Sequence, residues 1–280
     1  MPSADDIRES QRVAWARLST SWEQWDSIIM DQLGPVGAAM IERLGIADDQ
    51  QHLDIASGTG EPGLSIAELA PDGRVVLTDL SPEMLEVAAR RAEARGTTNV
   101  VTHVCSADDL PFDEASFDSV SVRFGYMFFP DMAKATAEFV RVLAPGGRLC
   151  ASVWTNPHDN AWTTIAMEAI ASEVQLPQAD PDGPSMYRCA APGHVGALFE
   201  DAGLREVAEW DVEIELVTQS PEQYWEMISD HVSLAAAALR EVDESARQRM
   251  RDIAVERVGH YERNGEVRVP GIARCIVGAK

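Results

Sequence analysis

The chain has 280 residues, 45% hydrophobic and 25% charged, which is typical of a soluble globular protein with a sizeable core. Acidic residues number 46 against 23 basic ones, and a net charge of -23 repels phosphate backbones, which disfavours nucleic acid as a partner. No basic-then-apolar leader opens the sequence, and no run approaches the roughly 18 apolar residues of a membrane span. We therefore expect a cytoplasmic protein without membrane insertion. The four cysteines show no C-x-x-C spacing, so neither a disulfide framework nor a metal site is indicated.

The first 45 residues have a helical pattern. Trp15, Leu18, Trp22 and Trp25 recur at three- and four-residue spacing. Gly34 and Pro35 then predict an interruption, followed by a second helix over residues 36–44. This tryptophan stripe either packs into the core or closes over a ligand.

From residue 51 the pattern changes to strands alternating with helices. Short apolar segments at 51–56, 74–79, 100–105, 117–124 and 148–154 predict strands, and 62–69, 82–96 and 132–143 predict helices. Ser81 and Gly96 suit the two ends of the helix over 82–96. Segment 191–204 predicts a further helix, and 206–216 and 268–280 predict two more strands. This alternation indicates an α/β fold, a Rossmann-like, mostly parallel sheet of seven strands with helices on both faces.

One domain over residues 1–280 accommodates all of these elements. We expect N-terminal helices over 1–48, a cofactor-binding core over 50–154 and a last strand over 265–280. Segments 155–190 and 220–264 interrupt the alternation, and such insertions lie at the carboxyl ends of strands, where ligands bind. Together with the N-terminal helices, they form either a lid over the site or a simple cover for the sheet.

A glycine-rich turn follows the first predicted strand, in the sequence HLDIASGTG over residues 52–60. Gly58, Gly60 and Gly63 also match the dinucleotide fingerprint, so an NAD(P)-dependent oxidoreductase is an alternative. Asp54 and Glu61 would repel a diphosphate, whereas Asp54 suits the ammonium group of an amino-acid-like ligand, directly or through water. Asp79, at the end of the second strand, suits a ribose diol.

Five segments resemble, in order and spacing, the class I S-adenosylmethionine-dependent methyltransferases, closest to their ubiquinone/menaquinone C-methyltransferase-like group. They are DIASGTGEPG, TDLSPEML, SADDLPF, FDSVSVRFG and RVLAPGGRL, within residues 50–154. The resemblance implies S-adenosyl-L-methionine as cofactor. It also implies the cofactor contacts: Asp54, Ser57, Gly58, Thr59, Gly60 and Arg123 at the methionine part, Asp79 at the ribose, and Leu80, Met84, Ser106 and Ala107 around the adenine.

Two positions qualify that resemblance. Ser106 stands where the family commonly has a carboxylate, so Asp108 or Asp109 is expected to supply the adenine contact. Trp25 and Asp26 resemble the aromatic–Asp pair near the start of the family, which makes Trp25 a candidate cofactor contact.

The predicted reaction is methyl transfer to a small, apolar, quinone-like or secondary metabolite by direct in-line displacement, which needs position and exclusion of water. The candidate bases are His158, Asp159, His194 and His231, although a lone histidine in a loop is more often an ordinary polar surface residue. Tyr126 either faces the acceptor or packs beside its phenylalanine neighbours. A protein that keeps the fold without transferring methyl groups, as a binding module or a cyclisation catalyst, is a further alternative. The oligomeric state stays open, a homodimer included.

Overall fold

Five parallel strands between residues 51 and 154 form one side of the sheet. The computed structural model describes residues 3–176 and 183–280, and within them the strand order is β3-β2-β1-β4-β5-β8-β6, with β7 paired to β8. β8 and β6 are antiparallel to their neighbours, so the sheet is mostly parallel, as predicted. The strands are β1 (Gln51–Ile55), β2 (Arg74–Asp79), β3 (Val100–Val104), β4 (Phe117–Arg123), β5 (Leu143–Trp154), β6 (Arg205–Thr218), β7 (Glu262–Arg263) and β8 (Glu266–Ala279).

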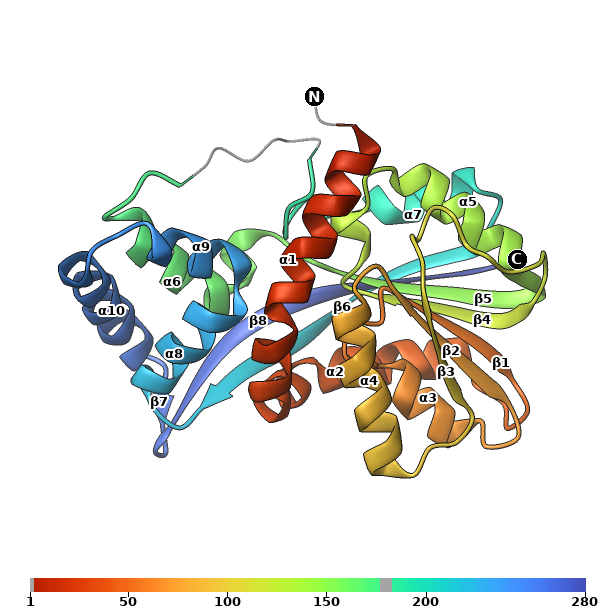
Figure 1. Ribbon diagram of the computed structural model, residues 1–280, viewed down its shortest axis with the longest axis horizontal. Coiled ribbons are helices and arrows are strands. Elements are labelled where there is room, and N and C mark those ends of the chain that lie inside the picture. The colour runs from red at the N-terminus through yellow and green to blue at the C-terminus, as the bar shows by residue number, and fades with distance from the viewer. Residues whose placement is uncertain (1–2, 177–182) are drawn as a thin grey trace.

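Helices cover both faces of this sheet (Figure 1), which confirms the predicted fold class. α2, α3 and α4 pack on one face, and α5 and α7 pack on the other. The helices are α1 (Ala4–Gln24), α2 (Asp26–Leu44), α3 (Gly63–Leu69), α4 (Pro82–Arg95), α5 (Met132–Val142), α6 (Ala161–Ala171), α7 (His194–Asp201), α8 (Pro221–His231), α9 (Ser233–Arg240) and α10 (Glu244–Gly259), with 3₁₀ turns η1 (Tyr126–Phe128) and η2 (Pro157–Asp159). None of the described helices is long and apolar enough to cross a membrane.

The predicted interruption at Gly34 and Pro35 is wrong. α2 continues through both residues, and the chain breaks earlier, at Trp25. Gly34 and Pro35 lie on the exposed face of α2, where water can satisfy the carbonyl that loses its N–H partner. The opposite face stays apolar across the proline, and its packing outweighs the local preference.

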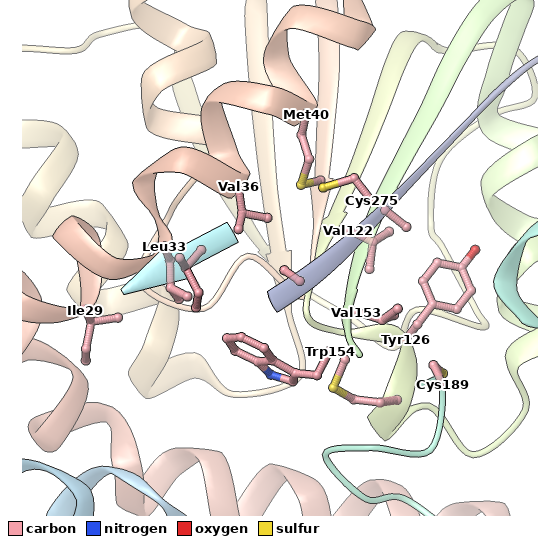
Figure 2. Close-up of a cluster of buried hydrophobic side chains, with 14 of the residues drawn as sticks. Ile29, Leu33, Val36, Met40, Val122, Tyr126, Val153, Trp154, Cys189 and Cys275 are labelled. Carbon is pink, nitrogen blue, oxygen red and sulfur yellow. The ribbon is translucent and has the colours of Figure 1, made fainter. Parts of the chain in front are cut away.

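The core lies between α2 and the sheet. Ile29, Leu33, Val36 and Met40 follow one face of α2 and are all buried. Figure 2 shows these side chains directed toward a group that includes Val122 of β4, Val153 of β5 and Cys275 of β8.

The remaining helices form a lobe at one end of the molecule, which we call the helical lobe: α6, α8, α9 and α10 (Figure 1). The long strands β6 and β8 extend from the sheet into this lobe. These helices arise from the two predicted insertions, although residues 177–182 of the first insertion lie outside the described residues.

Candidate active site

The glycine-rich turn begins where β1 ends, at the carboxyl edge of the parallel strands. Its backbone bends sharply, with positive φ at Ala56, Gly58 and Gly60. Gly60 must be glycine, because a Cβ there would lie 2.7 Å from Leu64 Cδ1 and its φ is +107°. The turn therefore brings bare backbone to the crevice beyond β1 and β4, where parallel sheets bind ligands.

Asp54 lies beneath this turn and is 0% exposed. Its Oδ2 accepts the backbone N–H of Gly63 at 3.0 Å, and its Oδ1 accepts the hydroxyl of Ser121 at 2.5 Å. Burial raises the pKa of Asp54 to about 7. The carboxylate is thus placed to shape the turn from below, a role that the sequence analysis did not foresee.

Asp79 ends β2 beside the turn and is half-buried. It accepts the N–H of Gly58 and the N–H of Ser81, each at 2.9 Å. Burial raises its pKa. Each carboxylate oxygen retains a second acceptor position, so the side chain can still bind a diol.

Opposite charges surround the turn at its other end. Arg91 of α4 donates to the carbonyl and the hydroxyl of Thr59, at 2.8 and 2.9 Å, and lies 3.1 Å from Asp26. Arg123, at the end of β4, donates to no acceptor within the described residues, and burial lowers its pKa. A carboxylate and an unengaged guanidinium near one turn suit a zwitterionic amino acid.

The predicted adenine contacts gather on the opposite side of the turn. Leu80 and Ala107 are half-buried, and Met84 is buried in the first turn of α4. Ser106 donates its hydroxyl to Asp108 at 2.6 Å. Asp108 is only 2% exposed and binds the guanidinium of Arg8, so its carboxylate faces α1 rather than a free adenine site.

Helix α1 crosses this edge of the sheet and covers the site (Figure 1). Arg8 holds its first turns to Asp108, and the ring of Trp15 lies 5.1 Å from that of Phe128. Near its end, Trp25 donates its ring N–H to Asp230 of α8 at 3.4 Å. Trp25 is therefore engaged with the helical lobe. The sequence signalled this cover only through its tryptophan stripe.

Comparison with known proteins identifies the family. The model of the ubiE/COQ5 methyltransferase family matches residues 37–177. A demethylmenaquinone methyltransferase of Thermus thermophilus is 44% identical over 113 residues, which cover 40% of this chain and 51% of that protein. An uncharacterised protein of Mycobacterium tuberculosis is 30% identical over 260 residues, 89% of this chain and 93% of the relative. The crystal structure of the YcgJ protein of Bacillus subtilis shares the fold, with a TM-score of 0.57 at 22% identity, over 87% of this chain and 97% of that one.

The chain belongs to the ubiE/COQ5 methyltransferase family. It spans about half the length of the Thermus enzyme that it matches. Family membership favours S-adenosylmethionine over NAD(P) as the cofactor and does not favour a protein without methyl transfer.

The residues around the turn fit the cofactor of a ubiE/COQ5 methyltransferase. The hydroxyl of Ser57 is buried and has no hydrogen-bond partner in the described part of the chain. Among residues 3–176 and 183–280 Arg123 donates to no acceptor, and Asp79 keeps free acceptor positions. These groups can bind the amino acid and the ribose of S-adenosylmethionine without first breaking an ion pair.

Four of the candidate catalytic residues lie away from this methyltransferase site. Tyr126 is fully buried, its hydroxyl lies 3.1 Å from that of Thr136, and its ring packs among phenylalanines, so the structure agrees with the packing alternative rather than with a side chain that faces the acceptor. His158, in η2, is 76% exposed and pairs with Asp159 at 3.1 Å. His194 begins α7, a helix that packs on β6 and β8.

His231 is different, because it ends α8 at the contact between the helical lobe and α1. Its ring centroid lies 4.5 Å from that of Trp22. The Nδ1 atom of His231 and the ring N–H of Trp22 are both buried without a partner among the described residues. Burial lowers the pKa of His231 to about 4, so the imidazole is neutral near pH 7.

Proposed function

We propose that the protein transfers a methyl group from S-adenosylmethionine to a small apolar acceptor, such as a quinone-like molecule, by direct in-line displacement. The arrangement of charges at the turn carries this proposal: Arg91 donates to Thr59, Arg123 donates to no acceptor in the part of the chain that the structure describes, and Asp79 lies beside the turn. The demethylmenaquinone methyltransferase similarity supports a quinone-like acceptor.

Aromatic side chains support an apolar acceptor. Phe124 follows β4 directly and stacks on Trp154 at the end of β5, with ring centroids 4.2 Å apart. Trp162 of the helical lobe lies 4.9 Å from Trp154. Flat, apolar rings at the carboxyl ends of β4 and β5 suit a flat, apolar ring of a substrate.

We propose that α1 and the helical lobe act together as the lid of one domain. S-adenosylmethionine supplies an electrophilic methyl group when it is bound. The lid excludes water from that group and orients the acceptor against it. Trp22 can donate its ring N–H to an acceptor oxygen, and the neutral imidazole of His231 can take up the proton that an acceptor carbon or hydroxyl loses.

The test has two stages. Isothermal titration should show binding of S-adenosylmethionine and S-adenosylhomocysteine, and reduced naphthoquinones lacking the ring methyl group should then yield S-adenosylhomocysteine. His231→Gln should lower turnover and leave cofactor affinity unchanged, whereas His158→Gln, the exposed control, should change neither. Folded protein that binds neither cofactor form would refute the proposal.

We infer further that the protein acts on small molecules rather than on nucleic acid, because its net charge of -23 opposes contact with phosphate backbones, and we propose the cytoplasm as its location. Whether it forms a homodimer is measured directly by light scattering after gel filtration.

A further inference from the structure

A line of hydrogen bonds runs beneath the glycine-rich turn, between β1 and β4. His52 and Asp54 face the same side of β1, opposite Ser119 and Ser121 of β4, and all four are 0% exposed. His52 Nδ1 lies 2.7 Å from Ser119 Oγ, and Nε2 lies 2.9 Å from Ser121 Oγ. Ser121 donates in turn to Asp54 at 2.5 Å.

The chemistry of these groups fixes the direction of every hydrogen bond. An ionised carboxylate only accepts hydrogen bonds, so Ser121 donates its single hydroxyl hydrogen to Asp54. The Ser121 oxygen then accepts from His52, which places the imidazole proton on Nε2. His52 Nδ1 is left to accept from Ser119. Burial lowers the pKa of His52 to about 3, which is consistent with this neutral form. All three donors thus point toward Asp54.

The other groups around Asp54 are few. Gly63 donates its N–H from the start of α3. Arg123 of β4 favours the carboxylate, and Glu61 of the turn opposes it, while Asp26 and Arg91 lie farther out, around Arg123. Burial alone would favour a protonated Asp54, so its donors decide how much carboxylate is present near neutral pH.

The charge of Asp54 matters to the turn because hydrogen bonds to an ionised acceptor are about twice as strong as neutral ones. The bond from Gly63 closes the segment that contains Gly58, Thr59 and Gly60. A protonated Asp54 would hold that segment more loosely.

We propose that His52 is a positioning residue for the cofactor: through Ser121 it keeps Asp54 in the carboxylate form that fixes Gly63, and so sets how cofactor affinity depends on pH. This inference rests on the proposed function, because the turn that Asp54 holds is the proposed cofactor turn.

The test compares pH profiles of affinity for S-adenosylhomocysteine, by titration calorimetry from about pH 5.5 to about pH 9. Wild-type affinity should rise with pH and level off above about 7, with release of a proton on binding in the acid range. His52→Leu and Ser121→Ala should move the midpoint of the profile to higher pH. Binding on the acid side should weaken about tenfold for each pH unit that the midpoint moves, and affinities should converge with the wild type near about pH 9.

Two further variants separate this role from simple damage to the core. His52→Gln retains one donor and one acceptor and should restore the wild-type profile. Ser152→Ala removes a hydroxyl that is equally buried, on the adjacent strand β5, and has no partner among the described residues, so its profile should match the wild type.

Profiles of His52→Leu and Ser121→Ala that fall below the wild type by the same factor at every pH would overturn the inference. So would a wild-type affinity that is independent of pH, and in that case the proposed function would stand. Absence of binding at every pH would refute both. If His52→Leu does not fold, Ser121→Ala decides the matter against its Ser152→Ala control.

Discussion

Gly63→Ala tests the close contact between the turn and the sheet. An added Cβ would lie 2.3 Å from Leu77 Cδ2 and 2.9 Å from Asp54 Oδ2, and both side chains are fully buried. Overpacking of this kind costs about 1–3 kcal/mol. Loss of the hydrogen bond from the Gly63 N–H to the carboxylate of Asp54 adds about 1.5–3 kcal/mol to this cost. The lower conformational entropy of the unfolded chain stabilises the variant by about 0.4–1 kcal/mol. We expect a net loss of about 1.5–5.5 kcal/mol, or about 3–11 °C in Tm.

Urea and thermal unfolding followed by circular dichroism measure this loss. Gly259→Ala is the matched control, because a Cβ at this position, the last residue of α10, meets nothing within 4 Å. There the same substitution should stabilise the protein by about 0.5–1 kcal/mol through helix propensity. Equal stabilities for Gly63→Ala and the wild type would show that the turn yields easily and that Asp54 does not hold it.

Three other substitutions have defined outcomes. Asp79→Ala should weaken affinity for S-adenosylmethionine by about 1–3 kcal/mol in calorimetry, and unchanged affinity would remove Asp79 from the site. Arg8→Ala leaves buried Asp108 without its main cation and should speed hydrogen exchange over residues 4–24; unchanged exchange would mean that other contacts hold α1. In the wild type, the raised pKa of Asp54 lowers the free energy of unfolding as pH rises from about 4 to 7. The lowered pKa of His52 increases the free energy of unfolding as pH rises from about 3 to 6.5, so the two effects offset each other. His52→Leu removes the contribution of His52, so its free energy of unfolding in urea should fall below that of the wild type by a difference that widens by up to about 1.4 kcal/mol per pH unit from about pH 4.5 to 6.5. A difference that stays constant over this range would contradict these assignments.

Local signals predicted most of the central fold. Ser81 caps α4 by accepting the N–H of Met84, and Gly96 ends that helix with a φ of +69°, as their positions in the sequence indicated. Pro35 misled the prediction because its cost is local, whereas the apolar face of α2 that outweighs it depends on the sheet.

The site was predictable only as far as it lies in contiguous motifs. The turn and Asp79 belong to such motifs. The pairing of Arg8 with Asp108 joins residues 100 positions apart, and Trp22 meets His231 through two helices that the sequence does not relate. His52 looked like an ordinary strand residue, because its partners Ser119 and Ser121 are identified only by the register of β1 on β4.

The ladder between β6 and β8 determines which part of the cover can move. It runs unbroken from Ala208↔Val277 to Thr218↔Val267, well beyond Trp154, where β5 stops. The helical lobe is therefore attached to the sheet by a continuous backbone-bonded ribbon, which resists bending. Helix α1 is joined to the rest by the peptide connection at Trp25 and, among the described residues, by side-chain contacts rather than backbone hydrogen bonds. Within the proposed lid, ligands should consequently come and go mainly by detachment of α1, while the lobe stays attached through β6 and β8.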